Sequence, residues 1–354
     1  MATVITNLLS AIPVFGQDIV ELKNIIEYIL NDVTTSILGI ITDVGGAYIN
    51  FNLTYISTII PVLPTVGTVS SHALKKGTKI RLDKKEYLSI PYQFIAFLVG
   101  FIDGDGYIQI TRTPKGYIAI KLVIGLQLED ISTLEYIESV LKLGKITINK
   151  DHKSSNCRLI FNRTDLQEII FPLLIHHGIF FITETRKNQF DLAMFILKND
   201  IKLFDDIPNL GSAYNSIKLY HDSDGPTTSG QTTSKALDYV NLHFFKNWLV
   251  GFTVAEGSFF IKKNNDGCFQ LKQRIHVQLF ESFKLLFETN RRISTENNKY
   301  NQFSVSSKAD IQKVINFFSF SGLHPLIGLK GIQYFNWLNK LHKSSRYKNN
   351  IFPG

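Results

Sequence analysis

Two acidic residues stand out because each closes the same residue pattern at a different place in the chain. Residues 97–110 read FLVGFIDGDGYIQI, and residues 248–261 read WLVGFTVAEGSFFI. Each copy is an apolar run with small residues at helical spacing that ends on an acid, Asp105 or Glu256, followed by glycine and an alternating tail. The repeat predicts two pseudo-symmetric halves within one chain.

The position of these acids predicts a metal centre. A carboxylate at the C-terminal end of a helix faces the negative end of the backbone dipole, which is locally unfavourable. Because this occurs twice at matching positions, we expect a positive charge there, most simply a divalent cation. If the helices pack along faces opened by Gly100 and Gly104, Asp105 and Glu256 meet. Two carboxylates with backbone carbonyls, water and phosphate oxygens suit Mg²⁺ or Mn²⁺.

Such a centre, shared by two halves, suits in-line hydrolysis of both strands of a DNA duplex. Bound metal ions stabilise the attacking and leaving oxygens, so the protein need supply no covalent nucleophile. Cys157 and Cys268 are the two cysteines of the sequence, and neither has companions at metal-ligand spacing. The sequence therefore indicates neither a disulfide framework nor a zinc cluster.

The charge of the chain is uneven. The formal net charge is +8, but residues 1–70 contain one lysine against five acids. The remainder is therefore strongly basic, which suits a polyanion such as nucleic acid. The hydrophobic content of 44% is enough for genuine cores.

The first seventy residues are apolar and differ in kind from the rest. They carry neither the basic start of a secretory signal nor the scattered arginines of a transit peptide. Residues 2–20 closely resemble a segment of mitochondrial cytochrome b, as expected for exon-encoded protein fused in frame to an intron reading frame. We therefore expect a leader at residues 1–21, an extension at 22–90, a first half at 91–204, a linker at 205–237, a second half at 238–346 and a tail at 347–354.

Hydrophobic periodicity predicts the order αββαββα in both halves, an α+β fold. In the first half we expect a helix at 96–102, strands at 107–112 and 117–127, a helix at 130–141, strands at 145–150 and 157–162, and helices at 165–174 and 185–197. In the second half we expect a helix that ends at 254, strands at 258–263 and 268–279, a helix at 281–288, strands at 292–296 and 302–306, and helices at 308–318 and 330–343.

The two repeated stretches resemble the LAGLIDADG motifs of single-chain homing endonucleases, and the likeness in pattern covers residues 90–346. The resemblance implies saddle-shaped antiparallel sheets that lie in the DNA major groove and a central two-helix interface. It also implies a monomer that cuts both strands of a long, asymmetric duplex site with Mg²⁺ and leaves 3′ overhangs.

The resemblance assigns site residues one by one. Asp105 and Glu256 match the metal carboxylates, and the carbonyls of Gly104 and Ala255 match further ligands. The basic residue of the family matches Lys330 in the second half and Lys187 in the first. Since the following glutamine is three residues after Lys330 but two after Lys187, Arg186 competes for the role.

Further positions depart from the family pattern. Gln278 matches a polar active-site residue, whereas its expected first-half counterpart is Leu126, with Gln127 adjacent. Val254 stands where the first copy has Asp103, a position that commonly caps or packs rather than ligating metal. We therefore expect the metal set to be intact and an ancillary contact to be lost.

Polar residues on the first two strands of each half are the candidate DNA contacts. Lysine and arginine can read guanine edges and glutamine can read adenine, while phosphate contacts outnumber base contacts. The candidates are Tyr107, Gln109, Thr111, Arg112, Lys115 and Lys121 in the first half, and Lys262, Lys263, Lys272, Arg274 and His276 in the second.

The leading hypothesis is a mitochondrial endonuclease that cuts an intronless cytochrome b gene and so starts the mobility of its own intron. The target should then include the codons of residues 17–20, where the likeness to the exon ends. The alternative is an RNA maturase that assists splicing of its own group I intron. A third interpretation takes residues 1–70 as a membrane tether.

Overall fold

The computed structural model describes residues 81–150, 155–208 and 235–353. The predicted leader, nearly all of the extension and most of the linker lie outside these residues, as does the candidate membrane tether. Among the helices that are described, none is long and apolar enough to cross a membrane.

The first half runs from a short helix into the first repeated stretch. Asp83 and Glu86 form a capping box that starts α4 (Lys84–Leu88). After Pro91 comes α5 (Tyr92–Asp105), which continues directly into β1 (Gly106–Arg112). Then follow β2 (Ile118–Gln127), α6 (Ile131–Leu141), β3 (Lys145–Asn149), β4 (Asn156–Phe161), α7 (Arg163–Asp165), α8 (Phe171–His177) and α9 (Glu184–Lys198).

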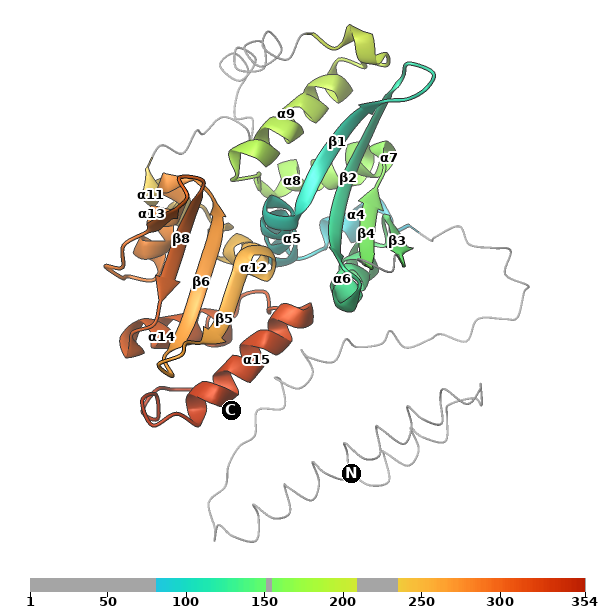
Figure 1. Cartoon of the computed structure of the whole chain (residues 1–354). Helices are drawn as coiled ribbons and strands as arrows, with labels where there is room; N and C mark the ends of the chain where they lie inside the picture. Colours follow the sequence, from blue (N-terminus) through green and yellow to red (C-terminus); the bar gives the residue numbers. More distant parts are fainter. Residues whose placement is uncertain (1–80, 151–154, 209–234, 354) are drawn as a thin grey trace, which may run out of the picture. The chain divides into compact units, whose positions relative to one another are not determined.

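The second half repeats this order (Figure 1). Its elements are α11 (Ala236–Asn241), α12 (Phe245–Glu256), β5 (Gly257–Ile261), β6 (Gly267–Arg274), α13 (Val277–Leu286), β7 (Ser294–Glu296), β8 (Tyr300–Val305), α14 (Lys308–Ile315) and α15 (Gly328–His342).

Each half contains one four-stranded antiparallel sheet. The strand order is β1-β2-β4-β3 in the first sheet and β5-β6-β8-β7 in the second. Each sheet thus places the strand that follows the repeated helix on one edge, and the long second strand beside it. The predicted α+β fold with two αββαββα halves is confirmed.

One predicted strand, 268–279, is too long. β6 ends at Arg274, and α13 starts at Val277 after His276, whose Nδ1 accepts a hydrogen bond from the Leu279 amide at 3.4 Å. Alternating apolar residues continue through this helix start, so the period gives no sign of the break. Histidine is also not among the usual N-cap residues.

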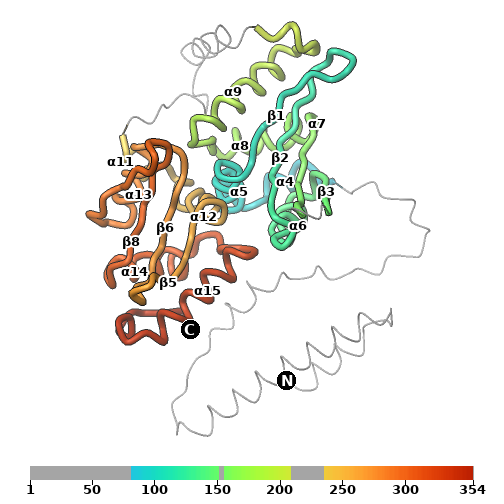
Figure 2. The backbone as a smooth tube through the Cα atoms, viewed as in Figure 1, coloured from blue at the N-terminus to red at the C-terminus, as the bar shows by residue number. Residues whose placement is uncertain are grey.

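The two halves belong to one compact unit and meet along α5 and α12. Figure 2 shows the two helices side by side. A methyl group on Gly100 would collide with the Trp248 carbonyl, and one on Gly251 would collide with the Phe97 carbonyl. The helices therefore pack backbone against backbone at these two glycines, as the small-residue spacing predicts.

A buried carboxylate crosses this interface. The side chain of Asp103 accepts hydrogen bonds from the Ile182 amide at 2.8 Å and from the Thr183 amide and hydroxyl at 3.1 and 2.5 Å. Trp248 of the other half donates its indole N–H to the same carboxylate at 2.7 Å. The repeat makes Val254 and Phe97 the equivalent pair, and both are buried and apolar. The interface is thus symmetric in backbone but not in chemistry.

We expect Gly100→Ala to lower the free energy of unfolding by about 3 kcal/mol or more, because the added methyl group has no space against a backbone carbonyl. Gly125→Ala is the control: its methyl group would meet no atom nearer than 3.8 Å. Urea denaturation of the two variants measures the difference. Equal midpoints would show that the helices do not pack this closely.

Candidate active site

Asp105 and Glu256 lie together where the paired helices end. Asp105 is the last residue of α5 and Glu256 the last of α12. A methyl group on Gly104 would collide with the Ala255 side chain and lie 3.2 Å from Cγ of Glu256. The backbone segments whose carbonyls were matched to metal ligands are therefore in contact, and the two acids flank them.

The electrostatics of this pair are unfavourable for two anions. Burial raises the pKa of Asp105 to about 6. Burial and then the nearby charge of Asp105 raise the pKa of Glu256 to about 7. Gln273 opposes this shift by donating its amide N–H to Glu256 Oε1 at 2.6 Å. The site thus holds two carboxylates whose charges are only partly neutralised by the protein.

Two cationic side chains, one from each half, face the acids. Lys330 of α15 donates from Nζ to the carbonyl of Gly257, and burial lowers its pKa while Asp105, Asp130 and Glu256 oppose the shift. Arg186 of α9 donates from Nε to the carbonyl of Ile102 at 3.3 Å, and it lies close enough to Asp103, Glu256 and Asp105 for their charges to act on it.

Lys187, the predicted first-half basic residue, points elsewhere. Its Nζ pairs with Asp191 at 3.3 Å, one turn further along α9. Arg186 instead occupies the third position of α9, as Lys330 occupies the third position of α15. The spacing of three residues to the next glutamine, Gln189 or Gln333, carried this signal in the sequence.

The polar neighbour of Glu256 is Gln273, not Gln278. Gln278 lies exposed in the first turn of α13, because β6 ends four residues earlier. The strand registers pair Gly106 with Ile124 and Gly257 with Leu271, so the residue equivalent to Leu126 is Gln273. As expected, the first half has the apolar Leu126 where the second half has a glutamine, but that glutamine is Gln273 and not Gln278.

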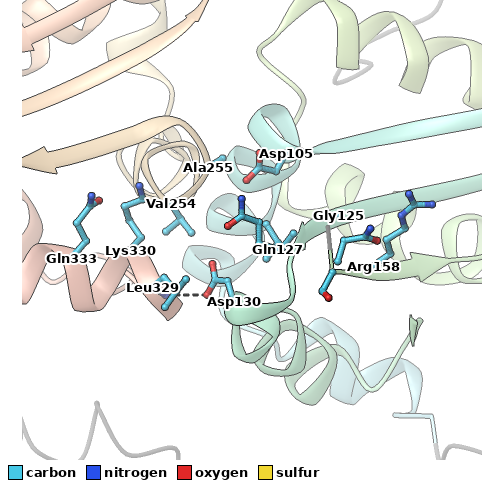
Figure 3. A pocket seen from close by; sticks show the side chains of 13 residues that line it. Asp105, Gly125, Gln127, Asp130, Arg158, Val254, Ala255, Leu329, Lys330 and Gln333 are labelled. Atoms are coloured by element: carbon cyan, nitrogen blue, oxygen red, sulfur yellow. Dashed lines mark hydrogen bonds between the residues drawn. The ribbon is translucent and has the colours of Figure 1, made fainter. Parts of the chain in front are cut away.

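A cleft opens beside the acids between the first sheet and α15 (Figure 3). Lys330 and Gln333 project from α15 on one side, and Gln127, Asp130 and Arg158 line the other. The Asp105 carboxylate lies at the edge shared with Val254 and Ala255. The cleft has room for a bulky polar group next to the carboxylate pair.

The residues present fit a divalent cation. In the part of the chain that the structure describes, no group of three or more His, Cys, Asp or Glu side chains could hold a metal. The protein contribution is thus two carboxylates with raised pKa values plus nearby carbonyls, which leaves positions for water and phosphate oxygens. This donor set matches hard, oxygen-preferring ions.

The family of the chain follows from its two repeats. The model of the LAGLIDADG endonuclease family matches residues 98–180 and again 249–341, so each half contains one copy. The chain belongs to the LAGLIDADG endonuclease family. The predicted family and enzyme class are thereby confirmed, and such endonucleases use divalent metal ions.

Curated relatives of this LAGLIDADG chain include the probable intron-encoded endonuclease aI3 of Dictyostelium discoideum, 22% identical over 71% of the chain and 96% of the relative. The protein of the same description from Debaryomyces hansenii is 21% identical over 70% of the chain and 37% of that longer relative. Both are named as intron-encoded.

Solved structures share the fold. I-SmaMI bound to uncleaved DNA in the presence of calcium ions is 21% identical, with a TM-score of 0.52 over 72% of this chain and 95% of that one. The I-SmaMI homing endonuclease bound to cleaved DNA is 20% identical, with a TM-score of 0.51 over 72% and 93% of the two chains.

The candidate DNA contacts of the first half divide between the two faces of the sheet. Tyr107, Gln109, Thr111 and Lys121 alternate with core residues and share the face opposite the core. Arg112 has the parity of the core residues and pairs with Asp205 at 2.7 Å, so it does not belong to that face. Lys115 lies exposed in the hairpin turn.

In the second half, Lys272 and Arg274 share the face opposite the core, where Lys272 pairs with Glu296 at 2.6 Å. Lys262 follows β5 and donates to Ser306 at 3.1 Å, whereas Lys263 lies exposed in the turn after this strand. His276 caps α13 and packs edge-on against Tyr239, 5.8 Å between ring centroids, so it does not lie on a strand.

Arg158 was missing from the predicted contacts. It is exposed on β4 and pairs in register with Gly125 and Thr147 on the face that carries Lys121. The alternation of residues 156–161 carried the signal, but the candidates were drawn from the first two strands of each half. This face of the first sheet is thus more basic than predicted.

The raised pKa values of Asp105 and Glu256 predict how stability depends on pH. Folding moves them up from 3.8 and 4.5, so the native chain binds more protons than the unfolded chain between about pH 4 and 7. The contribution that the two protonated carboxyls make to the free energy of unfolding is fully present below that window and is lost as the pH rises through about 6 and 7. In metal-free buffer at pH 8, Glu256→Gln should raise Tm by roughly 2–4 °C.

Thermal melts of the metal-free protein from pH 5 to 8 measure this effect, with exposed Glu135→Gln as the control. The Glu256→Gln variant should also lose part of the decline in Tm with rising pH. A Tm that falls at pH 8 would contradict the picture of two carboxylates held together against their repulsion.

Proposed function

We propose that this LAGLIDADG endonuclease cuts both strands of a specific DNA site by hydrolysis that depends on Mg²⁺ or Mn²⁺, and so promotes homing of its intron. The observation that carries the proposal is the carboxylate pair Asp105 and Glu256, held by the helix interface with a cation on either side. A buried pair of like charges is costly unless a positive group joins it.

The residues have distinct roles in this proposal. Asp105 and Glu256, with the carbonyls of Gly104 and Ala255, would hold the divalent cation, which when bound would stabilise the attacking and leaving oxygens. Arg186 and Lys330 offset charge that develops on the phosphate, because both cations lie within electrostatic reach of Asp105 and Glu256. Gln273 fixes the orientation of Glu256 through its hydrogen bond.

Duplex DNA is the proposed partner of a single chain, bound across the faces of the two sheets that lie opposite the core. Lys121 and Arg158 on the first sheet and Lys272 and Arg274 on the second supply positive charge to these faces. Such side chains bind phosphate and can read guanine edges in the major groove.

The proposed target is an intronless mitochondrial cytochrome b gene. The support is the likeness of residues 2–20 to cytochrome b, together with relatives named as intron-encoded endonucleases. The site should span the exon junction near the codons of Gln17 to Val20. A role as RNA maturase for its own group I intron is the alternative.

Asp105→Asn and Glu256→Gln should each slow cleavage of a duplex carrying this exon junction by about 100-fold or more. DNA binding should persist, since loss of an acid removes repulsion from phosphate. Gel assays of cleavage with Mg²⁺, and of binding in Ca²⁺, separate the two effects. If folded wild-type protein leaves the duplex intact, the proposed target is wrong, and assays of intron splicing then test the maturase role.

The two neighbouring cations of α9 provide a sharper test of the first-half site. Arg186→Ala should slow cleavage roughly 100-fold because a charge that faces both acids is lost. Lys187→Ala is the matched control and should cut at close to the wild-type rate, because its ammonium pairs with Asp191. The opposite ranking in single-turnover cleavage would restore Lys187 to the site.

A further inference from the structure

Asp130 joins the first half to the start of α15 in the second. It is the N-cap residue of α6, and its Oδ1 accepts hydrogen bonds from the Thr133 hydroxyl at 2.8 Å and from the Leu329 amide at 2.9 Å. Figure 3 shows the second bond beside the cleft. Leu329 immediately precedes Lys330, so Asp130 holds the turn of helix that carries this cation.

The first residue of α15 is tightly packed against Asp130 and Thr133. Gly328, the first residue of α15, has a φ of +58°, and a methyl group there would collide with Asp130 Oδ1 and the Thr133 hydroxyl. Glycine is therefore required twice, for its backbone conformation and for the space that the carboxylate occupies. A small shift at either side would move the helix start.

A contact of different chemistry occurs in the opposite direction. His276 is the N-cap residue of α13, as Asp130 is of α6, and its imidazole interacts with the backbone of Ile182 and with the charge of Glu184. These residues precede and begin α9, which carries Arg186. Each half thus uses the cap of its middle helix to hold the cation-bearing helix of the other half.

The two cation-bearing helices are otherwise anchored unequally. Asp103 binds the backbone ahead of α9, and Gln189 of α9 accepts the Ile108 amide at 3.0 Å. On the side of α15, Val254 replaces that acid. Among the atoms that the structure describes, Oε1 of the equivalent Gln333 is buried without a hydrogen-bond partner. α15 does have contacts within its own half: Asn247 Oδ1 accepts the His324 amide ahead of the helix at 2.8 Å, and the Trp337 indole donates to the Phe260 carbonyl at 3.2 Å. The contact with Asp130 is the one that meets the helix start directly beside Lys330.

We infer that Asp130 is a positioning residue for Lys330: it holds the start of α15 across the interface so that the lysine meets the carboxylate pair. This inference rests on the proposed nuclease function for its catalytic consequence, but the contact itself is independent of it. Misplacing a catalytic group by about 1 Å can cost roughly 100-fold in rate.

The test uses the full chain and two pairs of variants. Asp130→Ala removes the acceptor, whereas Asp130→Asn keeps an oxygen that can accept the Leu329 amide. Gly328→Ala disrupts the same contact from the side of α15, because the added methyl group would collide with Asp130 and Thr133. Gly322→Ala is its control, because Gly322 has a similar φ of +63° but no atom within 4 Å of the added methyl group.

Hydrogen exchange of the peptide that spans residues 328–334 reports on the contact without requiring activity. Asp130→Ala and Gly328→Ala should speed exchange there about 10-fold, and Asp130→Asn and Gly322→Ala should not. Unchanged exchange in Asp130→Ala would overturn the contact. Should that variant fail to fold, the two glycine variants decide by the same criterion.

Single-turnover cleavage of the exon-junction duplex, with each strand labelled separately, reports on positioning. Asp130→Ala and Gly328→Ala should slow cutting roughly 100-fold with DNA affinity retained, and nicked duplex should accumulate because Arg186 is undisturbed. Faster exchange with an unchanged cleavage rate would overturn the positioning role. If wild-type protein does not cut, the proposed function fails, while the exchange result still decides the contact.

Discussion

The close approach of α5 and α12 is the constraint on which the rest of the structure depends. Two glycines let the backbones touch, and this contact fixes where both helices end. Because the acids are the last helical residues, their meeting is a direct result of that packing. The two sheets, which start at the next residue on each side, are placed by the same contact.

The site that results is unstable by itself, and this is consistent with its proposed use. Burial raises the pKa of both carboxyls, and the charge of Asp130 adds to this for Asp105 as the charge of Asp105 does for Glu256. Burial lowers the pKa of the flanking Arg186 and Lys330. Fixed charges that are set in place before the reaction need little reorganisation during it. The fold thus holds these charges in place at a cost in folding free energy, as the proposed function requires.

Much of the fold could be predicted from the sequence, because the repeat and the two hydrophobic periods are local signals. The order of helices and strands along the chain and the pairing of the two repeated helices follow from them. The helix ends do not, since α5 spans Tyr92–Asp105 rather than 96–102 and α12 ends at Glu256 rather than at 254. Gln273 was missed because the alternation of residues 268–279 hides the end of β6. Arg186 was passed over in favour of Lys187, although the spacing to Gln189 already matched that of Lys330 and Gln333.

Contacts between the two halves could not be predicted from the sequence. Asp130 and His276 look like ordinary residues between a strand and a helix, and their partners are far away along the chain. No period or motif links such pairs. They become visible only when both halves are placed together. The prediction of His276 as a DNA contact fails for a different reason, because the strand predicted at 268–279 ends at Arg274.

The pair Asp103 and Trp248 has a consequence for which halves can associate. If the first half paired with a copy of itself, Asp103 would face Phe97, which has no N–H to donate. If the second half did so, the indole of Trp248 would face Val254, which accepts nothing. In the second case the buried indole N–H is left without an acceptor, at a cost of about 1–3 kcal/mol that occurs twice in the symmetric pair. In the first case Asp103 keeps its bonds to Ile182 and Thr183 and loses only the one from the indole. The pair Asp103 and Trp248 therefore favours association of a first half with a second half over association of two like halves.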